Sequence, residues 1–279
     1  MKNIVSVEWL HENLENPSIR IIDCRFHLDK PTEGLALYIE EHIPGALYFD
    51  LEKDLSSKVK AVGGRHPLPD IDTLVDKLSA AGIDNDTIVV AYDDQASMIA
   101  SRLWWLLKYL GHTQVFVLDG GYFKWKSEGY PTTNDFQQFQ RKEFSPVINS
   151  HFLADMSEVK ENVRTEISCL IDSRELKRFE GIEEPIDHKA GHIPGALQYF
   201  WRDCLNENYV WKTLDELKNH FNQLSINASI IVYCGSGVSA CPNILALDEL
   251  GYNNTKLYIG SWSDWISYED NPIELGVKS

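Results

Sequence analysis

The chain has 279 residues, of which 43% are hydrophobic, and its 42 acidic and 26 basic residues give a formal net charge of −16. This length suits two domains that each bury a core of their own. The acidic balance argues against a nucleic acid or an anionic membrane surface as a partner, because a basic patch usually draws such partners.

The N-terminal segment, Met1 to Trp9, lacks the long apolar run of a secretory signal, and no later stretch approaches the length of a transmembrane helix. We therefore expect a cytoplasmic protein with no membrane partner. The 5 cysteines are an odd number and contain no Cys-x-x-Cys pair. Neither a disulfide framework nor a metal site is expected from that pattern.

The first half of the chain alternates short apolar runs with segments of helical period. Apolar runs occupy residues 88–92 and 115–118, and the helical period is clearest at 99–107. Such alternation is typical of an α/β domain with a largely parallel sheet. The polar stretch 132–150 follows, and its composition predicts a linker.

The second half of the chain repeats the first. The sequence His-Ile-Pro-Gly-Ala-Leu at 42–47 recurs unchanged at 192–197, about 150 residues later. The Asp-x-Arg segment at 21–25 recurs at 170–174 in the same order. Two similar domains are predicted, at 1–131 and 151–279. Because His42 and His192 occur in both copies, a structural role is favoured for them.

Cys234 is the most informative residue of the second copy. It follows the apolar run 229–233 and precedes a helix-like stretch at 238–250. Gly235 and Gly237 permit positive φ and close backbone approach, so that N–H groups can converge on an anion. Those groups and the positive end of the following helix stabilise a thiolate. Cys234 is therefore a candidate nucleophile.

The first copy has Asp93 opposite Cys234 and lacks the glycines of the loop. We therefore predict a non-catalytic domain at 1–131, a linker at 132–150 and a catalytic domain at 151–279. Pro242 is compatible with the helix because it falls in or near the first turn, where no intrahelical N–H bond is lost.

Two other classes of enzyme fit the loop less well. A phosphatase with a Cys-x5-Arg loop also holds a thiolate in a phosphate cradle, but Ala240 occupies the place of the arginine that clamps phosphate. A Ser or Cys hydrolase is disfavoured because the loop is not Gly-x-Ser-x-Gly and no histidine is adjacent to it.

Taken together, the repeated His-Ile-Pro-Gly-Ala and Asp-x-Arg motifs, the loop Cys-Gly-Ser-Gly-Val-Ser-Ala at 234–240 and the segment 260–265 resemble tandem-domain rhodaneses over residues 1–270. The uncharged loop is most similar to that of 3-mercaptopyruvate sulfurtransferases, usually Cys-Gly-Ser-Gly-Val-Thr, and Ser239 keeps the hydroxyl of the threonine. Thiosulfate-preferring members typically carry Arg or Lys just after the cysteine.

This resemblance implies two rhodanese-like α/β domains, each a mostly parallel sheet flanked by helices. It also implies an enzyme in which Cys234 takes sulfur from a small anionic donor, 3-mercaptopyruvate, as a persulfide and passes it to a thiol such as thioredoxin or to cyanide. No cofactor is expected. Thiosulfate as the donor and a sulfur carrier without turnover remain alternatives. The residues implied in donor binding are Arg178, Gly235, Ser236, Gly237, Val238 and Ser239.

The resemblance further implies a proton relay of Glu52, His66 and Ser236, with Arg65 as an added anion contact. One departure from the family pattern concerns the donor site. Mercaptopyruvate enzymes usually carry a second arginine shortly after a Pro-Glu-Pro run, and this chain reads Glu-Glu-Pro-Ile-Asp at 183–187. The second carboxylate clamp is missing unless His188 or Lys189 replaces it, and weaker mercaptopyruvate binding would follow.

Overall fold

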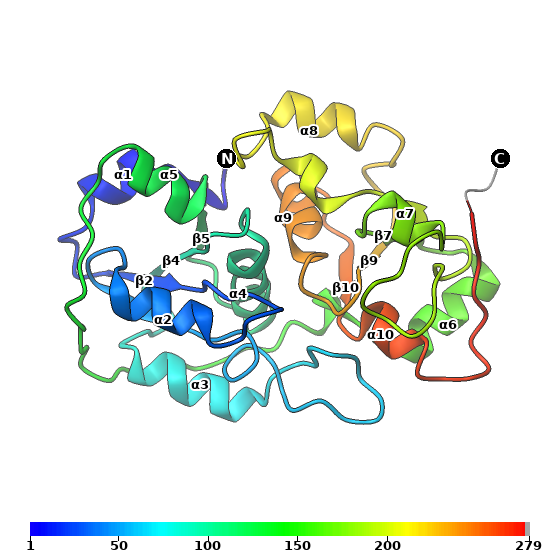
Figure 1. Ribbon diagram of the computed structural model, residues 1–279, viewed down its shortest axis with the longest axis horizontal. Helices are drawn as coiled ribbons and strands as arrows, with labels where there is room; N and C mark the ends of the chain where they lie inside the picture. The colour runs from blue at the N-terminus through cyan, green and yellow to red at the C-terminus, as the bar shows by residue number, and fades with distance from the viewer. Residues whose placement is uncertain (277–279) are drawn as a thin grey trace. The chain divides into compact units, whose positions relative to one another are not determined.

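The computed structural model describes residues 1–276, which fall into two compact units (Figure 1). Unit 1 contains residues 1–57, 68–149 and 205–211, and unit 2 contains residues 58–67, 150–204 and those from Lys212 onward. Each unit thus includes a short segment from the other half of the chain. The domain and linker limits predicted from the sequence remain a prediction.

Unit 1 is built on a five-stranded parallel sheet in the order β1-β5-β4-β2-β3. This sheet confirms the expected α/β class. Its strands are β1 (Ile4–Val5), β2 (Ile19–Asp23), β3 (Ala46–Tyr48), β4 (Ile88–Tyr92) and β5 (Val115–Leu118). Its helices are α1 (Val7–Glu12), α2 (Glu33–Glu40), α3 (Ile71–Ala80), α4 (Met98–Tyr109) and α5 (Gly121–Ser127).

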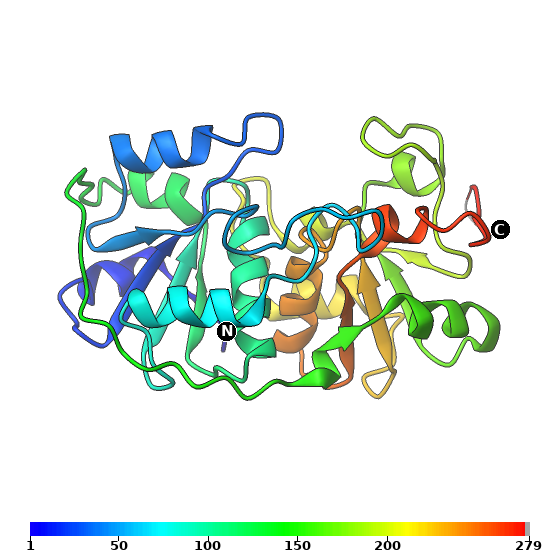
Figure 2. The same cartoon turned by 90° about the horizontal axis from the view of Figure 1, so that it is seen from below.

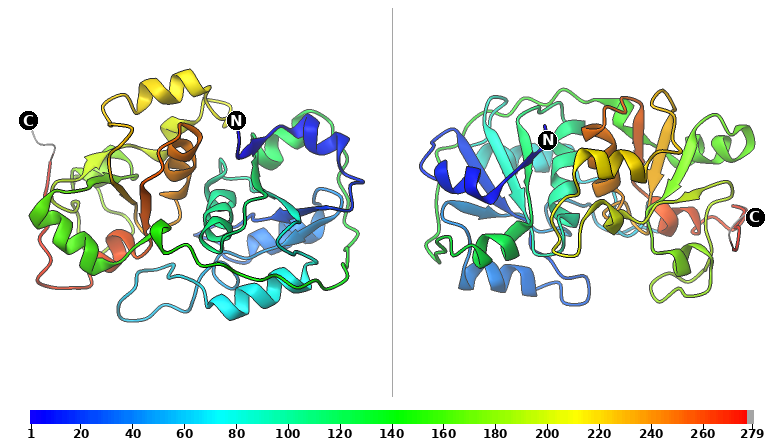
Figure 3. Two further views of the ribbon diagram at one scale, coloured as in Figure 1. Left: turned by 180° about the vertical axis from the view of Figure 1, so that it is seen from behind. Right: turned by 90° about the horizontal axis from the view of Figure 1, so that it is seen from above.

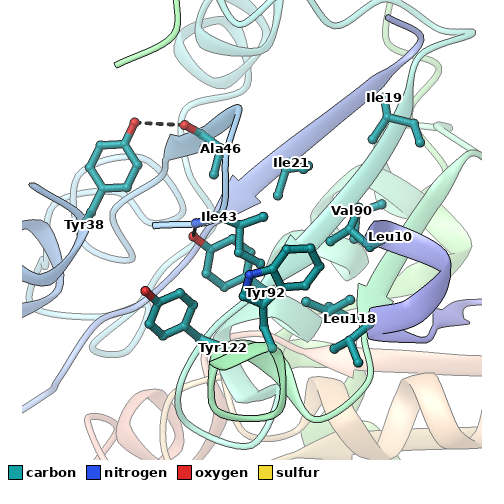
Figure 4. Packing of buried hydrophobic residues seen from close by; sticks show 12 residues of the cluster. Leu10, Ile19, Ile21, Tyr38, Ile43, Ala46, Val90, Tyr92, Leu118 and Tyr122 are labelled. Carbon is teal, nitrogen blue, oxygen red and sulfur yellow. Dashed lines mark hydrogen bonds between the residues drawn. The ribbon is translucent and has the colours of Figure 1, made fainter. Parts of the chain in front are cut away.

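Helices cover both faces of this sheet. One face packs against α1, α2 and α5, and α4 lies against β4 and β5 (Figures 1 and 2). Figure 4 shows the apolar cluster of the first face, where Tyr92 accepts a hydrogen bond from the Ile43 N–H at 3.3 Å and Tyr38 donates to the Ala46 carbonyl at 2.9 Å. Burial on both faces explains why the strands read as continuous apolar runs.

Unit 2 repeats this architecture with a five-stranded parallel sheet in the order β6-β10-β9-β7-β8 (Figure 3). Its strands are β6 (Leu153–Ala154), β7 (Cys169–Asp172), β8 (Leu197–Gln198), β9 (Ile230–Tyr233) and β10 (Thr255–Tyr258). Its helices are α6 (Met156–Thr165), α7 (Leu176–Phe179), α8 (Leu214–His220), α9 (Cys241–Glu249) and α10 (Ser261–Trp265), with 3-10 turns η1 (Ser150–Phe152) and η2 (Trp201–Cys204). Trp262 and Trp265 are buried in its core.

The repeated Asp-x-Arg motif forms a buried ion pair after the first long strand of each unit. In unit 2, Arg174 Nη2 donates to Asp172 Oδ2 at 2.6 Å and to the Gly191 carbonyl at 2.7 Å. In unit 1, Arg25 makes the matching pair with Asp23 at 2.7 Å. Since the pair in unit 2 also holds the residue before the His-Ile-Pro-Gly-Ala motif, the two repeated motifs stabilise one another.

The helix after Cys234 starts later than the sequence predicts. The helix-like stretch began at Val238, whereas α9 runs from Cys241 to Glu249. Gly237, with φ at +77°, lies in the turn that separates strand from helix. Pro242 lies in the first turn of α9, as expected. Among residues 1–276, no helix combines the length and the apolar character needed to cross a membrane.

Candidate active site

Cys234 lies directly after β9, at the carboxyl end of the unit 2 sheet, where parallel α/β folds place their ligands. Cys234 is 1% exposed to solvent. The Gly237 N–H donates to Cys234 Sγ at 3.2 Å, so the loop bends back onto the sulfur. The Cys234 N–H donates to Ser261 Oγ at 3.1 Å, and the Trp262 N–H donates to the Cys234 carbonyl at 2.9 Å. The start of α10 therefore holds the backbone of Cys234 in place.

The loop requires glycine at position 237. Its φ of +77° is a conformation that L side chains rarely adopt, and a Cβ added there would lie 2.2 Å from the Ile259 carbonyl oxygen. The backbone of the loop can approach Ile259, the residue after β10, this closely only without a side chain. At Gly237, therefore, both the positive φ and the close backbone approach require glycine.

Two members of the predicted relay lie side by side. His66 Nδ1 is 2.8 Å from Ser236 Oγ, and both residues are buried. The segment that carries His66 packs in unit 2, where the Gly63 N–H donates to Asp264 Oδ1 at 2.7 Å and the Arg65 N–H donates to Ser263 Oγ at 3.1 Å. Glu52 belongs to unit 1 and is exposed, and its place in the relay remains a prediction.

The two predicted arginines lie beside the residue that follows Cys234. A Cβ added at Gly235 would be 2.9 Å from Arg65 Nη2 and 3.6 Å from Arg178 Nη2. Arg178 is held there by α7, and Arg65 by the backbone bond of its own segment to Ser263. The pair of guanidinium groups supplies positive charge within reach of an anion bound at the loop.

Two acidic residues that the sequence analysis missed as partners contact these arginines. Glu184 accepts from Nε and Nη2 of Arg178, its shortest distance being 2.8 Å, and also accepts from Arg174 Nη1 at 3.3 Å. Asp187 accepts from Arg178 Nη2 at 3.1 Å through Oδ2 and from Arg65 Nη1 through Oδ1. The carboxylates are 4% exposed. The only feature of the sequence that indicated these contacts was the acidic segment 183–187, which stands where an arginine was expected.

The two carboxylates differ in how well their charge is compensated. Burial has the largest single effect on Glu184 and opposes its ionisation, but the hydrogen bonds and charge of Arg178, together with the N–H groups of Asp187 and Ile186, outweigh burial and lower its pKa. For Asp187 burial prevails and raises the pKa, although Arg65 acts in the opposite direction. Asp187 is thus the less stable anion of the two.

The corresponding loop of unit 1 carries its own anion. The Asp93 carboxylate accepts from the N–H groups of Gln95 and Ser97 at 2.9 Å each, and from those of Ile99 and Ala100 at 2.7 and 2.8 Å. Asp93 is fully buried, and this burial raises its pKa to about 6. The first repeat therefore keeps the anion cradle and fills it with an aspartate.

A separate surface cavity of about 800 Å³ in unit 2 borders β7 and β8 and is lined by His192, Gln198 and Ser229 among others. Neither Cys234 nor the two arginines line it. His192 Nδ1 lies 2.7 Å from the Phe179 carbonyl, as His42 Nδ1 does from the Tyr38 carbonyl, so the repeated histidines make matching backbone contacts. Within residues 1–276, no group of three or more His, Cys, Asp or Glu side chains is arranged to hold a metal ion.

Comparison with known proteins finds close relatives along the whole chain. Residues 6–128 and 155–268 each match the rhodanese-like domain. A probable 3-mercaptopyruvate sulfurtransferase of Pseudomonas aeruginosa is 39% identical over 278 residues, covering 98% of each chain. The 3-mercaptopyruvate sulfurtransferase of Escherichia coli K12 is 33% identical and covers 97% of each chain. Rat thiosulfate sulfurtransferase is also 33% identical, covering 94% of this chain and 91% of its own.

The solved structures agree with these sequence relatives. The crystal structure of SseA, a 3-mercaptopyruvate sulfurtransferase of Escherichia coli, has a TM-score of 0.83 at 32% identity and covers 94% of this chain and 100% of its own. The Tum1 protein of Saccharomyces cerevisiae has a TM-score of 0.86 at 24% identity, which shows likeness of fold alone.

Proposed function

Because the chain belongs to the rhodanese family and is a sulfurtransferase, we propose that it transfers the sulfur of 3-mercaptopyruvate to an acceptor through a persulfide on Cys234. The observation that carries this proposal is the Gly237 N–H, which points at Cys234 Sγ from 3.2 Å. A donor in that position stabilises a thiolate before the reaction and a persulfide anion after it.

The first step makes one bond and breaks one. The Cys234 thiolate attacks the sulfur of 3-mercaptopyruvate, the S–S bond forms, and the bond between that sulfur and C3 of the donor breaks. The electron pair of the broken bond remains on the carbon as the enolate of pyruvate, which takes up one proton. Ser236 and His66, in contact at 2.8 Å, are the groups we assign to deliver that proton.

The second step restores the enzyme. A thiolate of the acceptor, such as a reduced thioredoxin, or cyanide attacks the outer sulfur of the persulfide. The bond between the two sulfurs breaks, its electron pair returns to Cys234 Sγ, and the product leaves as a persulfide or as thiocyanate. The backbone of Gly235, Ser236, Gly237, Val238 and Ser239 supplies the surroundings of the anion throughout, without a cofactor.

Arg178 and Arg65 are the residues we assign to the donor's carboxylate. Both guanidinium groups border Gly235, and paired N–H donors suit a planar carboxylate. In this assignment Arg65 supplies the second positive charge that the sequence analysis sought at His188 or Lys189. A complete clamp supports 3-mercaptopyruvate over thiosulfate. The thiosulfate sulfurtransferases among the relatives keep thiosulfate as the second candidate donor.

The test combines mass and kinetics. Incubation with 3-mercaptopyruvate should add one sulfur atom, about 32 Da, to the wild type and nothing to Cys234→Ser. Cys169→Ser, which changes a half-buried thiol of the same unit, should behave as the wild type. Sustained turnover with an acceptor separates an enzyme from a carrier that is loaded only once. Sulfur transfer by Cys234→Ser would refute the mechanism, and a higher kcat/KM for thiosulfate would refute the donor.

A further inference from the structure

We propose that Asp187 is an internal competitor of the donor: its carboxylate occupies the anion site between Arg65 and Arg178, and the donor must displace it to bind. This inference rests on the proposed function in one respect, namely that these two arginines receive the donor's carboxylate. It adds a regulatory and specificity-determining residue to that site.

Asp187 contacts the two arginines with the geometry of a bound carboxylate. Asp187 offers one carboxylate oxygen to each arginine, Oδ1 to Arg65 Nη1 and Oδ2 to Arg178 Nη2. A carboxylate that bridges two guanidinium groups in this way is the arrangement expected for a bound α-keto acid. Since the guanidinium groups border Gly235, next to Cys234, the bridging carboxylate lies beside the nucleophilic loop.

The charges at this site are already balanced before a donor binds. Three arginines gather here, and each is matched by a buried carboxylate: Arg174 pairs with Asp172, Arg178 with Glu184, and Arg65 with Asp187. An anionic donor that entered with all three carboxylates in place would add an uncompensated charge to a buried site, which is costly. If Asp187 leaves as the donor enters, the balance of charge is kept.

Asp187 is held by fewer hydrogen bonds than Glu184 and is therefore the carboxylate that moves. Glu184 is tied to Arg174, to Arg178 and to the N–H groups of Ile186 and Asp187. Within the described part of the chain, the side chain of Asp187 is bonded to Arg65 and Arg178 alone. Burial removes water from the Asp187 carboxylate and raises its pKa, and the carboxylate regains that water when it leaves the site.

The segment that carries Asp187 is built to allow this movement. Residues 182–190 contain no helix or strand and lie between two glycines of positive φ, Gly181 at +77° and Gly191 at +112°. Ile182 and Ile186 in this segment are 68% and 54% exposed. Asp187 can therefore turn away from the arginines while β7, β8 and α7 keep their hydrogen bonds.

The experiment measures the affinity of the site without sulfur transfer. Pyruvate, the product of the proposed reaction, is titrated by calorimetry into Cys234→Ser and into the same protein with Asp187→Asn added. If Asp187 occupies the site in most molecules, only a minor fraction of the protein can bind pyruvate. Asp187→Asn abolishes the occupied state and should tighten pyruvate binding about tenfold. In the enzyme with Cys234 intact, Asp187→Asn should lower the KM for 3-mercaptopyruvate by a similar factor.

The matched control is Glu183→Gln. It removes the same charge from the same segment, but Glu183 is 58% exposed and pairs with Lys177 at 2.8 Å, away from both arginines. It should leave the affinity for pyruvate unchanged. Asp187→Ala provides the same readout if thermal unfolding shows that Asp187→Asn is poorly folded.

Weaker or unchanged pyruvate binding in the Asp187 variants would overturn the inference, because a residue that merely braces the arginines would loosen the site when removed. The failure of the proposed function has a different signature. It would show as sulfur transfer by Cys234→Ser, a result on which the pyruvate titration does not depend.

Discussion

His66 Nδ1 lies 2.8 Å from Ser236 Oγ, although 170 residues separate the two in the chain. Both side chains are buried, and they meet because the segment 58–67 packs in unit 2 beside the loop of Cys234. In the proposed reaction this pair protonates the leaving enolate of pyruvate. Thiosulfate would leave as sulfite, which needs no proton on carbon.

The first prediction uses this difference between donors. Ser236→Ala should lower kcat for 3-mercaptopyruvate by about 10²-fold, a typical contribution of a positioned acid, and lower thiosulfate turnover much less. His66→Gln should give the same loss, and the double variant no more than either, because the two residues act as a unit. Equal losses with both donors would instead indicate a packing role. Steady-state measurements of kcat with each donor distinguish proton transfer from packing.

Part of this site follows from the sequence and part of it cannot. Strand, turn and glycine patterns predicted the parallel sheets and the placement of Cys234 at a strand end, because these depend on local chemistry. The contact of Asp187 with Arg65 depends on how two irregular segments fold against one another, 122 residues apart. No periodicity records such a contact. The later start of α9 has the same origin, since the turn at Gly237 packs closely against Ile259, the residue after β10.

The second prediction concerns Gly237. Gly237→Ala should abolish persulfide formation and lower the melting temperature. The new Cβ would collide with the Ile259 carbonyl, and the positive φ would be strained for alanine. Gly195→Ala is the matched control. Gly195 has a φ of +78° but no heavy atom within 4 Å of an added Cβ. Gly195→Ala should lose only the stability that the strained φ costs, about 1–2 kcal/mol, and should keep its activity. Comparable effects of the two changes would contradict the collision.

The third prediction separates the two arginines by stability. Arg65→Met and Arg178→Met should each raise the KM for 3-mercaptopyruvate about tenfold with little change in kcat, as expected for loss of uniform binding. Arg178→Met should destabilise the fold by about 3 kcal/mol and Arg65→Met by less, because loss of Arg178 removes a positive partner from two buried carboxylates, those of Glu184 and Asp187, and loss of Arg65 from Asp187 alone. Donor kinetics and chemical denaturation measure the two effects. A fall in kcat alone would argue against a role in donor binding.

The fourth prediction concerns the aspartate that fills the cradle of unit 1. Since burial raises the pKa of Asp93 to about 6, above its value in the unfolded chain, the folded state takes up a proton first as the pH falls. The stability from this proton is fully present below the unfolded pKa and is lost as the pH rises through about 6. Between about pH 7.5 and pH 5 it amounts to about 1.4 kcal/mol in the unfolding free energy of unit 1.

Asp93→Asn should remove this pH dependence, because the amide does not titrate. Hydrogen exchange of β4 reports the stability of unit 1 separately from unit 2. The difference in unfolding free energy between wild type and Asp93→Asn should therefore change by about 1.4 kcal/mol between about pH 7.5 and pH 5, and the wild type should be favoured at the lower pH. Asp84→Asn is the control in the same unit, since hydrogen bonding with Lys142 holds the pKa of Asp84 at about 2, and its difference from the wild type should stay constant. A constant difference for Asp93→Asn as well would mean that the four N–H donors around Asp93 compensate its charge fully at neutral pH.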